Sequence, residues 1–255
     1  MRIDVGGYAL NYELTGSGPE TITLTHGLAS HLGTWKRQVS RLAQHYRVLT
    51  WDLRGHGKSD TPEGPWILAD LSGDLFRLLN ALSIPATHLL GHSAGGVVAL
   101  HCALTYPHLV KRLFLVGTAS EANERAAKWY EGLAQTAEQE GGEAVLKKVG
   151  LNEGAGALAP NGAGFAKAAR CMGGLYRSPL TPQLKELTCP VMMIVGDRDF
   201  IGPGGSVILH RNIPGSRLEI VKDRGHGIYL EDPDGFNTLL LDFLKPDATG
   251  EQGNG

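Results

Sequence analysis

Short β-rich runs alternate with longer amphipathic helical patterns along most of this sequence. This alternation is typical of βαβ units and predicts an α/β fold with a mostly parallel sheet flanked by helices. The first two runs are separated by Gly6-Gly7, a pair suited to a tight turn, and are expected to form an antiparallel hairpin. The predicted strands are Arg2–Val5, Tyr8–Leu14, Thr21–Thr25, Tyr46–Trp51, Thr87–Leu90, Arg112–Val116, Val191–Val195 and Leu218–Val221.

The strand rhythm disappears between Thr118 and Leu187, where helical patterns are joined by glycine-rich loops. We interpret this region as a helical lid inserted at the carboxyl edge of the sheet. The predicted division is a core of residues 1–119 and 188–246, a lid of residues 120–187 and a flexible tail of residues 247–255. Helices are expected in the lid at Glu121–Gln139, Ala144–Val149 and Gly164–Arg170, and in the core at Thr34–Ala43, Asp70–Leu82, Ala94–Tyr106 and Asp232–Leu244.

Composition excludes several classes of protein. A formal net charge of −2 gives no electrostatic basis for binding nucleic acid or an anionic membrane. The three cysteines, Cys102, Cys171 and Cys189, form no CxxC pair, so neither a disulfide framework nor a zinc site is indicated. The sequence has no secretory signal pattern and no apolar stretch of membrane-spanning length. We expect a soluble, cytoplasmic protein, and composition does not fix its oligomeric state.

The segment LLGHSAGGVVAL, residues 89–100, carries the most specific chemical signal. Its Gly91-His92-Ser93-Ala94-Gly95 matches G-x-S-x-G and lies directly between an apolar strand and an apolar helix. Such a turn holds the serine in a strained conformation above the strand ends, at the positive end of a helix dipole. Ser93 is therefore the candidate nucleophile.

A serine nucleophile needs a base, and His226 is the candidate because its glycine-flanked loop follows the last predicted strand. His92 and His56 are the less favoured alternatives. The acid that orients the base is expected at another strand end, where Asp197 and Asp199 follow Val191–Val195. Asp199 is preferred because it lies further along the loop, and Asp197 is expected to cap the turn. Glu121 and Glu124 are the remaining alternatives for the acid.

The chain order Ser93, Asp199, His226 is the order of α/β-hydrolases, and differs from the orders in chymotrypsin and subtilisin. The oxyanion of an acyl-transfer intermediate needs two hydrogen-bond donors. The backbone N–H of Ala94 is one candidate. The N–H of Leu28, in the loop after Thr21–Thr25, is the other.

Together these residues resemble the α/β-hydrolase superfamily over nearly the whole chain outside the predicted lid. The resemblance implies an eight-stranded sheet, and residues 51–59 (WDLRGHGKS) look like the family's D-x-R-G-x-G-x-S loop. Epoxide hydrolases and haloalkane dehalogenases of this family would carry aspartate at Ser93. The spacing from Gly27 to Trp35 looks like the esterase, lactonase and haloperoxidase-like branch. Carbon–carbon hydrolases are similar but typically have tryptophan where this chain has Gly227.

The expected activity is cleavage of small, apolar carboxylic esters through an acyl-enzyme, with no cofactor or metal. A lactonase, carbon–carbon hydrolase or perhydrolase using the same triad is the alternative. A non-catalytic ligand receptor is the less favoured reading. Arg170, Arg177 and Lys167 are possible anchors for a substrate carboxylate, although solvated helix charges are the simpler interpretation. The residues expected to bind substrate are Trp129, Phe165, Met172, Tyr176, Phe200 and Ile228.

Overall fold

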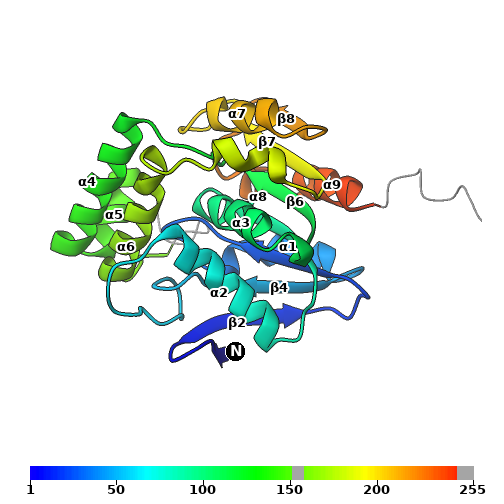
Figure 1. Ribbon diagram of the computed structural model, residues 1–255, viewed down its shortest axis with the longest axis horizontal. Coiled ribbons are helices and arrows are strands. Elements are labelled where there is room, and N and C mark those ends of the chain that lie inside the picture. Colours follow the sequence, from blue (N-terminus) through cyan, green and yellow to red (C-terminus); the bar gives the residue numbers. More distant parts are fainter. Residues whose placement is uncertain (151–157, 246–255) are drawn as a thin grey trace, which may run out of the picture.

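The computed structural model describes residues 1–150 and 158–245. Within these ranges the strands form an eight-stranded sheet in the order β1-β2-β4-β3-β5-β6-β7-β8 (Figure 1). The pairs β1–β2 and β2–β4 are antiparallel and the others are parallel, which confirms the predicted mostly parallel fold. The strands are β1 (Arg2–Asp4), β2 (Ala9–Thr15), β3 (Thr21–Thr25), β4 (Arg47–Trp51), β5 (Thr87–His92), β6 (Val110–Val116), β7 (Val191–Gly196) and β8 (Arg217–Val221).

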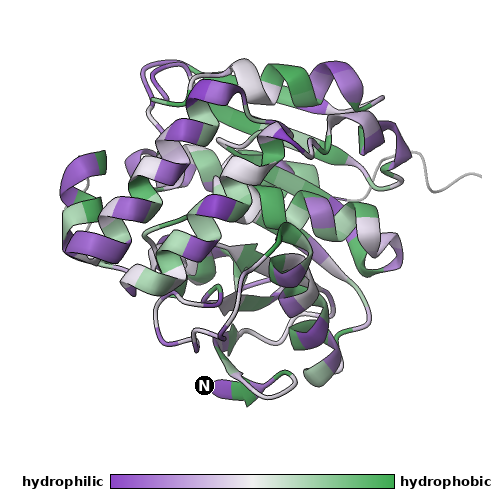
Figure 2. Cartoon of the chain, turned by 60° about the vertical axis from the view of Figure 1, so that its left-hand side comes forward, coloured by the Kyte–Doolittle hydropathy of each residue, from purple (hydrophilic) through white to green (hydrophobic). Residues whose placement is uncertain are grey.

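Helices cover both faces of the sheet because successive strand residues point to opposite sides. Leu89 packs in the cluster under one set of helices, and its neighbour Leu90 packs in the cluster under the other set. The first set is α2 (Leu68–Ala81), α3 (Ala94–Thr105) and α7 (Gly204–Asn212). The second set is α1 (Lys36–Leu42), α8 (Ile228–Glu231) and α9 (Pro233–Leu244). Figure 2 shows mostly hydrophobic strands at the centre and hydrophilic residues on the surrounding helices.

Three helices lie together to one side of the sheet, beside α3 (Figure 1). These insertion helices are α4 (Glu124–Glu140), α5 (Gly142–Val149) and α6 (Gly162–Gly173). They share an apolar cluster that contains Leu133, Val145 and Phe165 together with Ala29 of the sheet domain. The insertion therefore has a small core of its own and a contact with the loop that follows β3.

Gly55 and Gly164 form a close backbone contact between the insertion helices and the rest of the chain. A Cβ added to Gly164 would lie 2.5 Å from the Cα of Gly55, and one added to Gly55 would lie 2.6 Å from the Cα of Gly164. Only glycine at both positions permits this approach, which joins α6 to the loop after β4.

In the part of the chain that the structure describes, no helix is long and apolar enough to cross a membrane. The predicted tail, residues 247–255, lies outside the described residues.

Candidate active site

Ser93 occupies the turn between β5 and α3 with φ 53° and ψ −121°. The positive φ is unfavourable for a residue with a side chain, so the surroundings must hold it in place. The Ser93 N–H donates to Val116 O at 2.8 Å, and the Thr118 hydroxyl donates to Ser93 O at 2.7 Å. β6 and the residue two positions after it therefore hold the nucleophile turn.

The glycines on either side of Ser93 permit the close crossing of strand and helix. A Cβ on Gly91 would lie 2.3 Å from Gly95 O, and a Cβ on Gly95 would lie 2.3 Å from His26 O. Both contacts are with backbone atoms, which cannot move aside as a flexible side chain can. The G-x-S-x-G spacing is thus required by packing in this fold.

His226 and Asp199 meet at the carboxyl ends of β7 and β8. His226 Nδ1 lies 2.8 Å from Asp199 Oδ2, and Asp199 Oδ1 accepts the Ile201 N–H at 2.8 Å. A proton on Nδ1 leaves Nε2 of the neutral ring as the acceptor, which is the tautomer that a general base requires. Asp199 is buried, whereas Asp197 is exposed.

Gly117 makes room for this pair, and the sequence reading did not single it out. It follows β6 with φ 52°, and an added Cβ would lie 2.8 Å from Asp199 Oδ2 and 3.1 Å from His226 Nδ1. The signal in the sequence was a glycine directly after the strand RLFLV, at the same sheet edge as Ser93.

Ser93 and His226 line one cavity of about 440 Å³, which we call the apolar cavity. The insertion helices, the loop after β3 and the segment after β7 form its walls. Its described apolar lining residues are Leu28, Ala29, Trp129, Tyr130, Leu133, Val145, Val149, Phe165, Phe200, Ile201 and Leu230. The Phe200 ring lies 4.6 Å from the His226 ring, so it packs directly against the candidate base.

The six expected substrate-binding residues divide into two groups. Trp129, Phe165 and Phe200 line the apolar cavity. Met172 is buried in the core beneath α2 and α3, and Ile228 is buried in the core beneath α9. Tyr176 is exposed beside a groove on the outer side of the insertion. Apolar character alone does not say which face of a helix turns to the cavity, and these three residues do not line it.

The two candidate oxyanion donors flank Ser93. Ala94 begins α3 directly after the nucleophile, and Leu28 lines the apolar cavity. A Cβ on Gly27 would lie 3.1 Å from the Ser93 Cβ, so this loop passes very close to the nucleophile. Helix-terminal N–H groups such as that of Ala94 have no intrahelical acceptor and remain available to a ligand.

His92 supports the loop that carries His226. His92 Nε2 lies 3.0 Å from the carbonyl oxygen of His226 and must donate to it. The ring is buried between His226 and Tyr229, and burial lowers the pKa of His92 well below its usual value. His92 is therefore neutral and bonded to the backbone, which does not fit the alternative that it is the base. His56 is also buried, and it does not line the apolar cavity.

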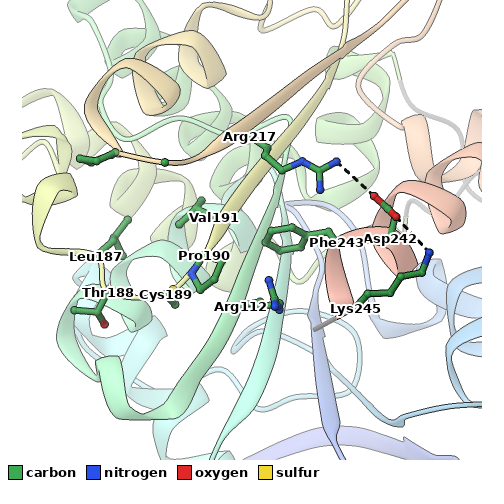
Figure 3. A pocket seen from close by; sticks show the side chains of 12 residues that line it. Arg112, Leu187, Thr188, Cys189, Pro190, Val191, Arg217, Asp242, Phe243 and Lys245 are labelled. Atoms are coloured by element: carbon green, nitrogen blue, oxygen red, sulfur yellow. Dashed lines mark hydrogen bonds and ion pairs between the residues drawn. The ribbon is translucent and has the colours of Figure 1, made fainter. Parts of the chain in front are cut away.

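A cavity of about 600 Å³ lies at the opposite edge of the sheet, where β7 and β8 begin (Figure 3). Asp242 lies between Arg217 and Lys245 there. Its described lining residues include neither serine nor histidine. Burial raises the pKa of its Cys189 thiol to about 11, so this cysteine is not a ready nucleophile. Among the residues that the structure describes, no cluster of His, Cys, Asp and Glu is arranged to hold a metal ion.

The sheet order and the strained serine between strand and helix define an α/β protein of hydrolase type. The family described as alpha/beta hydrolase fold matches residues 20–147, and the chain belongs to this family. Its general function is therefore hydrolysis.

Several relatives align over almost their full length. The enol-lactonase from Burkholderia xenovorans LB400 is 26% identical with a TM-score of 0.86, covering 96% of this chain and 99% of that one. A thermophilic esterase from Thermogutta terrifontis is also 26% identical with a TM-score of 0.86, covering 96% and 98%. The 3-oxoadipate enol-lactonase 2 of Acinetobacter baylyi is 27% identical, covering 93% of each chain.

Proposed function

We propose that this chain is a serine hydrolase that cleaves carboxylic esters, with Ser93 as nucleophile, His226 as base and Asp199 as the residue that orients the base. The observation that carries the proposal is the hydrogen bond of 2.8 Å between His226 Nδ1 and Asp199 Oδ2, made at the cavity that also contains Ser93. It leaves the other ring nitrogen free to accept the serine proton.

The proposed reaction has two balanced halves. Ser93 Oγ bonds to the ester carbonyl carbon as its proton moves to His226 Nε2. His226 then protonates the departing alcohol, which leaves an acyl group on Ser93. Water adds to the acyl carbon, gives its proton to His226 and releases the acid, while Ser93 regains its proton. The N–H groups of Leu28 and Ala94 are proposed to stabilise the negative oxygen in both halves.

We propose further that residues 120–187 act as a lid that selects the substrate. The apolar cavity is bounded by Trp129 and Leu133 of α4, Val145 of α5 and Phe165 of α6. Burial of an acyl or alcohol chain against these side chains favours apolar esters, at roughly 0.8 kcal/mol per buried methylene. The cavity volume of about 440 Å³ suits a small substrate.

A lactonase is the second candidate, supported by the similarity to the enol-lactonase from Burkholderia xenovorans LB400. Lactones are cyclic esters and would react at the same serine by the same steps. The glycine at 227 still argues against the carbon–carbon hydrolase branch that the sequence resembles.

The test is hydrolysis of p-nitrophenyl acetate, butyrate, octanoate and laurate, measured by the release of p-nitrophenol. We expect turnover that Ser93→Ala abolishes, with a short or medium chain preferred. Ser178→Ala is the matched control, because Ser178 lies outside both the apolar cavity and the nucleophile turn. A folded protein with no Ser93-dependent turnover of any ester contradicts the ester-hydrolase proposal, and lactones become the next substrates.

A further inference from the structure

Ser93 also lines a second cavity, of about 320 Å³, on the other side of the nucleophile. The segment after β6, the start of α4 and the start of α7 form its walls. It shares Ser93, Tyr130 and Ile201 with the apolar cavity. A substrate whose carbonyl carbon reaches Ser93 therefore has room for a substantial group on each side of the scissile bond.

One carboxylate-bearing residue, Glu121, lines the second cavity at a solvent-exposed position, and we call this space the Glu121 cavity. Glu121 Oε2 accepts the Thr181 hydroxyl at 2.5 Å. No ion pair joins Glu121 to a cation in the described part of the chain. Among its described lining residues the apolar cavity also has one acidic side chain, Glu231, whose Oε2 accepts the Gly225 N–H at 2.8 Å.

The described lining residues of the two cavities include no lysine or arginine. Of the three cations considered as anchors, Arg177 lines the groove on the outer side of the insertion, and the other two have partners outside both cavities. Arg170 is held by Glu131 and Glu138 at 2.6 to 3.0 Å on the outer side of the insertion. Lys167 donates to Pro62 O at 2.8 Å and lies over the Trp66 ring. Residues 151–157, outside the described part, have the sequence LNEGAGA and bring no cationic side chain.

We infer that the site accepts esters whose two groups are uncharged or cationic, and that Glu121 is the residue that rejects an anionic group from its cavity. This inference rests on the proposed function. A substrate carboxylate in the Glu121 cavity meets a like charge, and no lysine or arginine among the described lining residues of that cavity offsets it. An ammonium group there gains a partner, so one side chain provides both the attraction and the exclusion.

The test compares charge on the alcohol and on the acyl side, because either group can enter the Glu121 cavity. The alcohol series consists of the butyrate esters of 3,3-dimethylbutanol, choline and 4-hydroxybutanoate. Their hydrolysis is measured in a pH-stat by the acid that is released. The acyl series is the p-nitrophenyl esters of 6,6-dimethylheptanoate, 5-trimethylammoniopentanoate and adipate. In each series the neutral and cationic compounds have the same shape, and the third carries a carboxylate.

In at least one series we expect kcat/KM for the anionic ester to be about tenfold or more below that of the neutral ester. The cationic ester should equal or exceed the neutral one. Glu121→Gln should narrow the anionic-to-neutral gap at least about fivefold in the same series. Glu124→Gln is the matched control, because Glu124 is exposed like Glu121 but pairs with Lys128 and lines neither cavity, and it should leave the ratio unchanged.

The ratio is measured within each variant, so a general loss of activity does not imitate the effect. Anionic esters hydrolysed as well as neutral ones in both series would overturn the inference and leave the proposed function intact. A gap that Glu121→Gln does not change would also overturn the role of Glu121. Absence of Ser93-dependent turnover of both neutral esters would instead overturn the proposed function, and this inference with it.

Discussion

His92 illustrates how one side chain of the nucleophile strand can position a residue more than a hundred positions away. Its Nε2–H donates to His226 O at 3.0 Å, and its ring lies 4.5 Å from the His226 ring. The contact fixes the backbone of the candidate base and takes no part in proton transfer. We therefore propose His92 as a positioning residue.

We predict that His92→Leu lowers kcat about tenfold or more with little change in KM, because the His226 carbonyl loses its donor and the base loses its alignment. His92→Gln provides an N–H of similar reach and should recover part of kcat. Steady-state kinetics on p-nitrophenyl butyrate test both variants. Equal losses in the two variants would show that ring packing, and not the hydrogen bond, is what matters.

The second prediction at the scale of single residues concerns Gly117. We expect Gly117→Ala to lower kcat at least about a hundredfold, because the new methyl group occupies the space of the Asp199 carboxylate. The positive φ adds a backbone cost of about 1 to 3 kcal/mol.

Gly215→Ala is the matched control, since Gly215 has φ 70° and open space where the Cβ would be. It should lose similar stability and keep its activity. Thermal melts and kinetics measured together distinguish the backbone strain of a positive φ from the steric clash of the new methyl group with Asp199. Comparable activities of the two variants would contradict the role given to Gly117.

At the scale of elements, the sheet was predictable because its central strands are buried along their whole length and stand in the sequence as short, continuous β-rich runs. The strand β3 was expected and found at Thr21–Thr25. The insertion helices were expected, but their first residues were not. The side chain of Asn123 accepts the Ala126 N–H and that of Asn161 accepts the Gly164 N–H, so these asparagines set where α4 and α6 begin.

The helix α7 was not predicted, because little of it is buried. Only Ser206 and Leu209 are fully buried along Gly204–Asn212, and the amphipathic signal is correspondingly weak. At the site, chain order and strand ends were enough to nominate Ser93, Asp199 and His226. Which face each insertion helix turns toward the apolar cavity depends on packing between distant segments. For this reason Met172 and Tyr176 were expected to line the cavity although they do not.

The contact between Gly55 and Gly164 gives a prediction about how the insertion helices are held against the core. Gly164→Ala should displace α6 from the core, because the new Cβ would lie 2.5 Å from the Gly55 backbone. We expect KM for p-nitrophenyl octanoate to rise about threefold to tenfold, since the part of the apolar cavity wall that α6 provides moves. Limited proteolysis should cut the insertion faster.

Gly132→Ala is the matched control in the same insertion. Gly132 lies inside α4 with nothing within 4 Å of an added Cβ, so alanine should stabilise the helix by up to about 1 kcal/mol. If both variants show the same KM and the same cleavage rate as the parent protein, the glycine contact does not hold the lid.

At the scale of the whole molecule, several histidines are buried in their neutral form beneath the site. His26 donates through Nδ1 to Gly27 O at 2.7 Å and accepts the Leu53 N–H at Nε2, so neither nitrogen is free to take a proton. Burial, together with the neighbouring His56 ring, lowers the pKa of His26 to about 3, against a weaker opposing effect of Asp52. Burial also lowers the pKa of His56 and of His92.

These histidines predict a fold that loses stability in mild acid. Below pH 6.5 these histidines bind protons in the unfolded chain but stay neutral in the folded chain. The free energy of unfolding therefore falls as the pH falls. For His26 alone the loss between pH 7.5 and 5.5 is about 1.4 kcal/mol, and His56 and His92 add to it. Paired carboxylates do not offset this loss, because they titrate at lower pH.

Urea unfolding at pH 7.5, 6.5 and 5.5 measures the slope of the unfolding free energy against pH. His26→Asn should reduce the number of protons taken up on unfolding by about one at pH 5.5, whatever it does to stability at pH 7.5. A variant that is less stable but keeps the parent slope would place the acid sensitivity in other groups.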